Sequence, residues 1–493
     1  MPRTLVICCD GTWNTARDDT NVRRLHDALA TTPTQVPQYF SGVGTHGGPL
    51  SRLLGGATGA GLSETIRVAY RWLADHWTPG DRLVLLGFSR GAFTVRSLVG
   101  MLTRCGLVRF PDDASDADRD RLVRHVYDDG YRRRRALPDV ATQPGFGPDD
   151  VAPLDFLGVW DTVGALGVPK TFGLLSTLFA GDVRFHDTSL DDDVRHARQA
   201  LALDERRGPY VPAVWATPAP GAHASFAQLW FPGGHGDVGG GTPDRALSDG
   251  ALRWMVEEVT RTVGLTWDTD LRGLAGDPCV PRDDEPTGLW SLLSPRPRTV
   301  PRVVEGAADV HATAVARRAC PLTPPYRPGV VPQVGVPVTF RVDAAEPWDE
   351  SGLYLPAGRY RFRATGSWRD HGSAVPATGT GRWPLWSWPG RALGTVLDGV
   401  RRATRALTSR RADGIGSRRV LEARWMELVL AVANDVLHGD GTLDEGTTTG
   451  IGPDGTVEVD VPRPGYLYAF ADDAWTGYRS NRGSVEVTCE RRG

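Results

Sequence analysis

Short apolar runs alternate with stretches of helical spacing through the N-terminal part of the chain. The apolar runs have the length and composition of buried strands and lie at residues 5–9, 38–43, 82–86, 154–160 and 226–231. Apolar residues recur at helical spacing over 21–30, 62–77, 92–102 and 246–263. Strands that alternate with helices pair in parallel and are covered by helices on both faces. The pattern therefore predicts an α/β fold with a mostly parallel sheet.

Beyond residue 334 the apolar period becomes that of half-buried strands. Candidate strands with turn residues between them lie at 336–342, 358–364, 456–461, 465–470 and 483–489. They predict a C-terminal β-sandwich, which a segment of helical pattern interrupts at 374–445. The Pro- and Arg-rich stretch 268–333 has little periodicity and is a lid, a wrap-around segment or a linker. We expect two domains, residues 1–333 and 334–493.

Length, charge and cysteine usage narrow the class of protein. A chain of 493 residues is too long for one ordinary core, and a net charge of −3 gives no reason to expect a nucleic-acid partner. The N-terminal apolar run is too short for a signal peptide, and no stretch has transmembrane length. The six cysteines show neither CxxC nor zinc spacing, which suits a reducing compartment. We expect a cytoplasmic protein, or one exported without a cleaved signal peptide.

One serine stands at the apex of a predicted strand–turn–helix. The apolar run 82–86 leads directly into Gly-Phe-Ser-Arg-Gly, in which the serine is Ser89, and helical spacing follows. Such a turn lifts a serine clear of the sheet and needs small residues on both sides. This context favours a nucleophilic serine over an ordinary serine in a βα turn.

Two further polar residues follow predicted strands, in the order Ser89, Asp161, His235, which is that of α/β-hydrolases. The carboxyl ends of parallel strands share one edge of a sheet, so we expect the three side chains to meet there. Ser89 would attack a carbonyl, His235 would move the proton, and Asp161 would orient the imidazole. Asp237 is the alternative acid, although it lies close to His235 in the chain. The fold expected is α/β-hydrolase-like, and catalysis requires no cofactor.

An oxyanion site needs two backbone N–H donors near the nucleophile. One should be the N–H of Arg90, and the other should come from Gly11 or Thr12, after the first predicted strand. Asp10 would orient that loop or satisfy its turn amides. The Asp-Gly-Thr sequence also occurs in haloacid-dehalogenase-type phosphatases, but Cys8 stands here in the place of their nucleophilic aspartate.

Several longer motifs resemble a bacterial α/β-hydrolase family that includes the type VI secretion lipase effectors of the first class. They are CCDGTWN, GFSRGAFTVRSLVGMLTRCGLV, FLGVWDTVGALGVP, ALDERR and QLWFPGGHGDVGGG, all in the region of residues 1–330. The resemblance implies a phospholipase or related esterase, with Ser89, Asp161 and His235 in the triad positions.

The C-terminal region is similar to the β-sandwich of the calcium-dependent galactophilic bacterial lectin. The similarity lies in residues 344–372 and 466–488. It implies calcium ligands at the carbonyl of His371, Asp473, the carbonyl of Gly477, Ser480 and Asn481, with Ser480 in place of an Asn. Calcium and carbohydrate are therefore candidate ligands of this region, and an ordinary Asp/Asn turn in a structural domain is the alternative.

The predicted insertion contains a basic amphipathic segment. Apolar residues at helical spacing and six arginines lie within 391–411, after three tryptophans between residues 383 and 388. Such a helix either packs on the hydrolase or lies in a bilayer interface.

These features predict a serine hydrolase that cleaves lipid esters, with phospholipids as the favoured substrate. The alternatives are an esterase of small or carbohydrate esters, and a surface- or carbohydrate-binding protein with an inactive hydrolase scaffold. The expected partner is a lipid or membrane surface. Nothing in the sequence supports an immunity protein or a secretion machinery as a partner.

Overall fold

A six-stranded parallel sheet forms the centre of the N-terminal region, as the sequence predicts. A computed structural model describes residues 2–11, 18–42, 60–163, 190–208, 210–282, 295–380, 419–420, 422–437, 443–475 and 477–492. The sheet has the order β2-β1-β3-β4-β5-β6. Its strands are β1 (Thr4–Cys9), β2 (Gln35–Phe40), β3 (Arg82–Phe88), β4 (Leu154–Trp160), β5 (His196–Ala202) and β6 (Ser225–Phe231).

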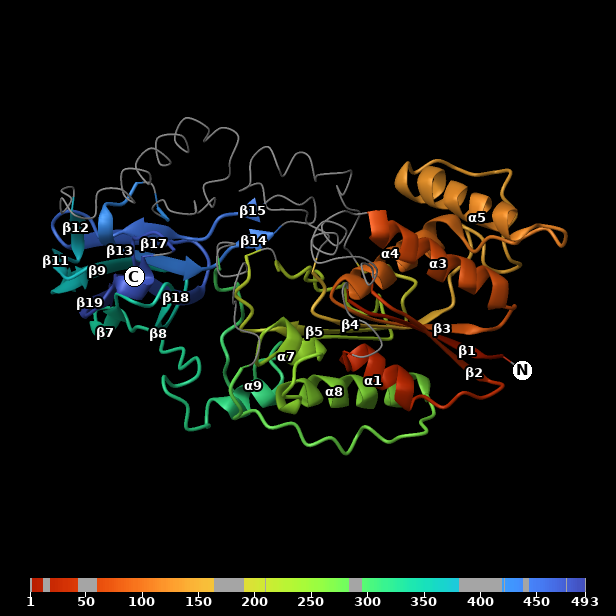
Figure 1. Cartoon of the computed structure of the whole chain (residues 1–493), viewed down its shortest axis with the longest axis horizontal. Coiled ribbons are helices and arrows are strands. Elements are labelled where there is room, and N and C mark those ends of the chain that lie inside the picture. The colour runs from red at the N-terminus through yellow and green to blue at the C-terminus, as the bar shows by residue number, and fades with distance from the viewer. Residues whose placement is uncertain are drawn as a thin grey trace.

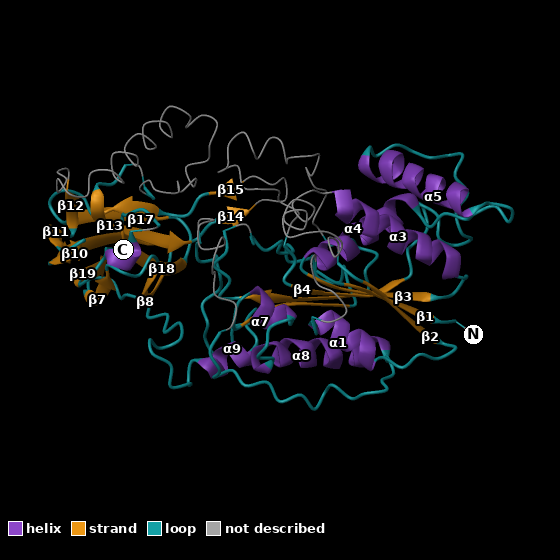
Figure 2. Cartoon of the chain, viewed as in Figure 1, coloured by secondary structure: helices purple, strands orange, loops and turns teal. Residues whose placement is uncertain are grey.

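Helices cover both faces of this sheet. Helices α3 (Ala60–His76), α4 (Arg90–Cys105) and α5 (Asp116–His125) lie on one face, and α1 (Asn21–Ala28), α7 (His235–Gly239) and α8 (Ala246–Val263) lie on the other (Figure 2). A π-helical turn (Val126–Arg132) follows α5. Each face of the sheet packs against its own apolar core, and alternate residues of β1 point into the two cores. Ile7 packs with the α3–α4 layer, and Val6 packs with the α1–α8 layer.

Strand β5 has no counterpart among the strands predicted from the sequence. It carries Arg198 and Gln199 in its middle, both of which are buried. The Arg198 guanidinium donates to Glu258 of α8 and to the backbone and hydroxyl of Ser225. A partner from a distant helix thus makes a buried arginine tolerable in a central strand, and local sequence does not show that partner.

The C-terminal strands form antiparallel sheets, consistent with the predicted sandwich. One path has the order β12-β13-β18-β8, with β16 also on β13, and the other has the order β17-β9-β19-β7. The first comprises β8 (Asp349–Leu355), β12 (Thr378–Thr380), β13 (Trp425–Ala433), β16 (Thr448–Gly450) and β18 (Gly465–Ala471). The second comprises β7 (Val338–Asp343), β9 (Gly358–Thr365), β17 (Thr456–Val461) and β19 (Ser484–Arg491). Short hairpins pair β10 (Ser367–Asp370) with β11 (Ser373–Pro376), and β14 (Val436–Leu437) with β15 (Leu443–Asp444).

The helical pattern predicted over 374–445 is wrong wherever the structure describes that range. Its two ends contain strands, most prominently β13, all nine residues of which are buried. Leu428 and Leu430 face the sandwich core, whereas Val429 and Ala431 pack with Phe470 on the opposite face. A strand buried on both faces loses the alternation that identifies strands, so its apolar run mimics a helix. The basic amphipathic segment 391–411 lies outside the described residues.

The two sets of strands stand beside each other in the molecule (Figure 1). A shared apolar cluster joins them, and it includes Leu203 after β5, Val300 and Val303 of the intervening segment, and Tyr466 and Tyr468 of β18. Helix α9 (Ala312–Arg317) belongs to the same layer through Ala314. Within the Pro- and Arg-rich stretch, residues 300–314 therefore contribute to the packing between the two sets of strands, whereas residues 268–277 lie along α1 and α8. The domain boundary at residue 333 stays a prediction.

Two cysteines that spacing did not pair form a disulfide. Cys279 and Cys320 are bonded, with Cα atoms 5.3 Å apart and a sequence separation of 41. The sequence analysis missed this bond, because spacing alone does not show which thiols the fold brings within bonding distance. No helix among the described residues is long and apolar enough to cross a membrane.

Candidate active site

Ser89 lies in a strained turn between β3 and α4. Its backbone has φ 58° and ψ −121°, which non-glycine residues rarely adopt, and its N–H donates to the carbonyl of Trp160. A Cβ on Gly91 would come within 2.1 Å of the Cys9 carbonyl oxygen, and one on Gly87 within 2.6 Å of the Gly91 oxygen. The two glycines are therefore required sterically, as the Gly-x-Ser-x-Gly pattern indicates.

The structure brings His235 and Asp161 into direct contact. His235 Nδ1 lies 2.6 Å from Asp161 Oδ2, and both side chains are buried. Asp161 directly follows β4, and His235 is the first residue of α7, just after β6. The His235 ring also packs on Phe88, the neighbour of Ser89, with ring centroids 4.6 Å apart. The imidazole thus lies at the same sheet edge as the serine turn, in contact with the predicted acid.

A buried arginine holds the other side of the Asp161 carboxylate. Arg298 Nη1 donates to Oδ1 at 2.7 Å and Nη2 donates to Oδ2 at 2.9 Å, while the Ala202 N–H donates to Oδ1 at 2.9 Å. Burial raises the pKa of Asp161, but the charges and hydrogen bonds of Arg298 and His235 outweigh burial and leave the pKa below its ordinary value. Sequence reasoning missed Arg298 because it lies in the aperiodic Pro- and Arg-rich stretch.

Asp237, the alternative acid, performs a different task. Its Oδ2 accepts the N–H of Gly234 at 2.8 Å and so closes the first turn of α7. A Cβ on Gly233 would come within 2.3 Å of the Asp237 Cβ, so this turn is tightly packed. Asp237 thus shapes the loop that carries His235, whereas Asp161 contacts the His235 ring.

Two acidic residues after β5 also hold the histidine loop. Asp204 accepts the N–H of Gly233 at 2.8 Å, and Glu205 accepts the N–H of His235 at 3.1 Å. Arg207 in turn donates to both oxygens of Glu205. These residues belong to the motif ALDERR, which the sequence analysis noted but to which it gave no role.

The loop after β1 lies against the serine turn, because a Cβ on Gly91 would clash with the carbonyl oxygens of Cys9 and Asp10. Asp10 accepts hydrogen bonds from the Gly11 N–H at 2.7 Å, from Thr20 Oγ1 at 2.5 Å and from the Tyr39 hydroxyl at 2.8 Å. The Gly11 N–H is therefore directed to its neighbour's carboxylate. Arg90 begins α4, and first-turn N–H groups have no acceptor within their own helix. Thr12 lies outside the described residues.

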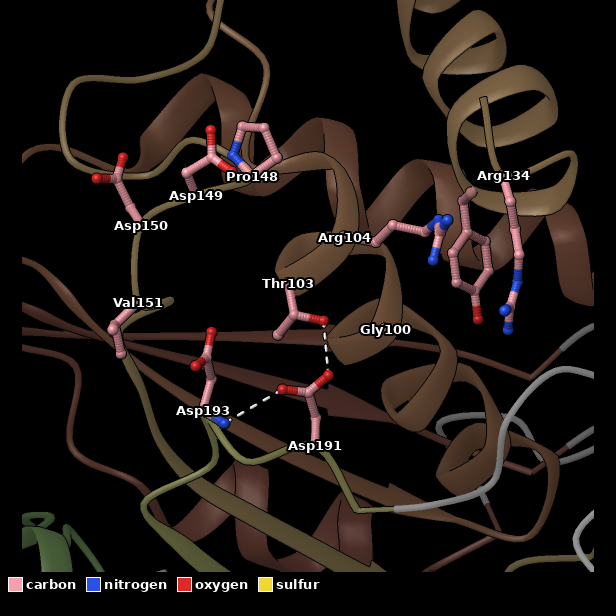
Figure 3. Close-up of a pocket in the computed structure, with 11 residues that line it drawn as sticks. Gly100, Thr103, Arg104, Arg134, Pro148, Asp149, Asp150, Val151, Asp191 and Asp193 are labelled. Carbon is pink, nitrogen blue, oxygen red and sulfur yellow. Dashed lines mark hydrogen bonds between the residues drawn. The ribbon is translucent and has the colours of Figure 1, made fainter. Parts of the chain in front are cut away.

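A pocket of about 480 Å³ lies elsewhere, about three helical turns along α4 from Ser89 (Figure 3). Its charged lining residues are Arg104, Arg134, Asp149, Asp150, Asp191 and Asp193. Asp191 accepts from Thr103 Oγ1 at 2.8 Å and from the Asp193 N–H at 3.2 Å, as the dashed lines show. Its carboxylate thus fixes the loop before β5, and the pocket is distinct from the site around His235.

The structure also gathers the residues that the lectin resemblance singled out. Ser480 Oγ lies 3.3 Å from His371 Nδ1 and donates to the Gly477 carbonyl at 2.7 Å. Asn481 Nδ2 donates to Asp473 Oδ2 at 3.1 Å, while the buried Asn481 Oδ1 has no hydrogen-bond partner. Among the described residues, no three His, Cys, Asp or Glu side chains are arranged as a metal site.

Comparison with known proteins identifies the N-terminal region. Residues 3–258, just over half of the chain, match the model of the catalytic domain of Tle1-like phospholipase effectors of type VI secretion. The chain belongs to this family. Membership supports a hydrolase that acts on lipid esters. The match to the Tle1-like domain ends at residue 258, so Arg298 and the C-terminal strands lie beyond it.

Individual relatives of the Tle1-like chain are distant. An uncharacterized protein of Saccharomyces cerevisiae is 26% identical over an alignment of 244 residues that covers 43% of this chain and 34% of that protein. The chain thus matches about a third of the length of this curated relative.

Among solved structures, an uncharacterized Pseudomonas aeruginosa protein is 17% identical, and the match covers 54% of this chain and 46% of that chain with a TM-score of 0.30. A propionate-bound esterase from Thermogutta terrifontis is 13% identical, and the match covers 54% of this chain and 85% of that chain with a TM-score of 0.31. The N-terminal domain of EclA, a PllA-like lectin, is 19% identical, and the match covers 31% of this chain and 94% of that chain with a TM-score of 0.17.

Proposed function

We propose that the chain is a serine hydrolase that cleaves ester bonds of phospholipids with Ser89, His235 and Asp161. The observation that carries the proposal is the contact between His235 and Asp161 at the sheet edge where the strained turn presents Ser89. Family membership adds the substrate class, and a lipid surface is the proposed partner.

In the proposed reaction, Ser89 Oγ attacks the ester carbonyl carbon while His235 Nε2 takes the hydroxyl proton. The 2.6 Å hydrogen bond from Nδ1 to Asp161 fixes the tautomer and stabilises the imidazolium. His235 then protonates the leaving alcohol, and the acyl group stays on Ser89. Water, deprotonated by His235, releases the carboxylic acid and restores the serine. The Arg90 N–H is the first proposed oxyanion donor. The Gly11 N–H is bonded to Asp10 in this structure, so Thr12, which lies outside the described residues, is the remaining candidate for the second donor.

A covalent probe and two substrate types test this proposal. We expect a fluorophosphonate to label the full chain at Ser89, as mapped by mass spectrometry, and not to label Ser89→Ala. We expect vesicles of phosphatidylethanolamine and phosphatidylglycerol to be hydrolysed faster than short-chain nitrophenyl esters. Turnover of the nitrophenyl esters alone would support a small-ester esterase. A chain that is neither labelled nor active would be a binding protein on a hydrolase scaffold.

Calcium binding by the C-terminal turn is a second proposal, favoured by the buried and unpartnered Asn481 Oδ1. Asp473, Asn481 and Ser480, with the carbonyls of His371 and Gly477, supply the oxygen atoms that calcium prefers. We expect millimolar calcium to raise the Tm of the full chain, because a ligand of the folded state stabilises it, and Asp473→Asn to abolish the rise. Equal Tm values in calcium and in a chelator would contradict the proposal. Carbohydrate binding there stays a prediction.

A further inference from the structure

Arg298 reaches the candidate triad from outside the family's catalytic domain. Its guanidinium contacts both oxygens of Asp161 at 2.7 and 2.9 Å, the Ala202 carbonyl at 2.9 Å and the Tyr210 carbonyl at 2.6 Å. The side chain is only 5% exposed. A buried arginine that is paired in this way with a carboxylate fixes the plane of that carboxylate.

Residues 295–303, which we call the strap, carry Arg298 into this position. Val300 and Val303 of the strap are buried in the cluster that joins Leu201 and Leu203 to the tyrosines of β18. The Arg296 N–H donates to the Arg206 carbonyl at 2.6 Å, which ties the strap to the segment after β5.

The C-terminal strands hold the other side of the strap. The Val303 N–H donates to the Tyr466 hydroxyl at 2.9 Å, and the Trp348 indole donates to the Pro295 carbonyl. Tyr466 belongs to β18, and Trp348 directly precedes β8. The strap is therefore fixed between the parallel sheet and the antiparallel strands.

We propose that Arg298 is a positioning residue of the triad and that the C-terminal strands, through the strap, keep it against Asp161. The proposal rests on the function proposed above. It gives the C-terminal region a part in catalysis that is independent of any ligand recognition. Arg298 acts through Asp161, because its described hydrogen bonds go to Asp161 and to the carbonyls of Ala202 and Tyr210.

Arg298 has two physical effects on the acid. Of the four hydrogen bonds that described residues make to the carboxylate, Arg298 supplies two, and Ala202 and His235 supply the others. Arg298 also shares the negative charge that would otherwise act on the imidazole alone. Among the described residues, the other titratable groups beside His235 are Glu205, which is paired with Arg207, Asp237 of α7, and Tyr210, whose ring packs on the imidazole. The groups keep these contacts when Arg298 is removed.

Removal of Arg298 should therefore lower the rate and move its pH dependence. We expect Arg298→Met to reduce kcat by roughly 10- to 100-fold, with KM changed by less than about twofold. This loss in kcat corresponds to the net free energy of one hydrogen bond to a charged group. The acid limb of the kcat/KM profile should move to higher pH, because an unshared carboxylate charge stabilises the protonated histidine more strongly. Arg298→Lys should retain part of the activity, since it keeps the charge without the paired geometry.

The full chain serves for every measurement, with rates expressed per fluorophosphonate-labelled site. Arg317→Met is the matched control, because Arg317 of α9 is likewise a buried arginine, but it lies outside the strap and donates to the carbonyls of Pro278 and Val280 rather than to the triad. We expect this control to have wild-type kcat and pH dependence. Tyr466→Phe removes the acceptor of the Val303 N–H. It should lower kcat by a few-fold and move the acid limb of the pH profile in the same direction as Arg298→Met.

A role in stability alone would lower the number of labelled sites while each site kept the wild-type kcat and pH profile, and that result would overturn the proposal. The low-field proton resonance of the His235 Nδ1–H gives a readout that does not need turnover. It should be present in the wild type and in Arg317→Met, and shifted or broadened in Arg298→Met. If the wild type neither labels nor hydrolyses lipid, the proposed function fails, whereas an unchanged resonance in Arg298→Met refutes the positioning role by itself.

Discussion

Ser89→Ala should lose about 10⁴- to 10⁶-fold in kcat on phospholipid vesicles, because the substitution removes the attacking oxygen. Its Tm should stay close to that of the wild type, since alanine meets the same backbone strain at φ 58° as serine does. Steady-state hydrolysis and thermal unfolding of the same preparations provide the two measurements.

Ser97→Ala is the matched control for this experiment. Ser97 is a buried serine of α4, the helix that follows Ser89, and its hydroxyl is hydrogen-bonded to Tyr131 rather than placed at the sheet edge. We expect this variant to keep the wild-type kcat. Ser89→Ala with wild-type activity would mean that another residue performs the nucleophilic attack.

Asp161→Asn should lose both activity and stability. We expect kcat to fall by about 10⁴-fold, because an amide cannot hold the imidazole in the productive tautomer. The free energy of unfolding should fall by about 3–5 kcal/mol, because the buried Arg298 loses its carboxylate partner. Hydrolysis rates and denaturant unfolding measure the two effects.

Asp237→Asn separates the two candidate acids. Asp237 accepts a backbone N–H within its own turn, so this substitution should cost much less activity than Asp161→Asn. A larger loss in Asp237→Asn would reverse the assignment of the acid.

The pH dependence of stability follows from the same carboxylate. The folded-state pKa of Asp161 is lower than its unfolded-state value, so its contribution is fully present above the unfolded pKa of about 4. The contribution should disappear as the pH falls from there through the lower, folded-state pKa. The difference in unfolding free energy between the wild type and Asp161→Asn should therefore be constant near neutral pH and shrink only in acid.

Local patterns were enough for much of the N-terminal sheet. Strands β1 and β3 contain continuous apolar runs, and one polar residue, Asp155 or Gln228, interrupts the apolar run of β4 or β6. The helices between these strands keep one apolar face, so neighbouring residues reveal each element. The serine turn could also be predicted from the sequence. Gly87 and Gly91 are required by contacts within a few residues of Ser89 or with the adjacent strand.

The failures share one physical cause. Strand β5 contains a buried arginine whose partner Glu258 lies on a distant helix, and β13 is buried on both faces by segments far away in the chain. The bond between Cys279 and Cys320 likewise forms only because the fold brings together two residues that are 41 positions apart in the chain. In each case the deciding contact is absent from the local pattern.

By itself, the sequence determined that this protein has a parallel α/β sheet with a serine at a sharp turn, and it placed Asp161 and His235 after two further strands. Only the tertiary structure decided that His235 pairs with Asp161 rather than relying on Asp237, and that Arg298 completes the acid's surroundings. A strand end can be recognised from the residues that form it. The partner of a buried charge is chosen by the packing of distant segments, and no local spacing encodes that choice.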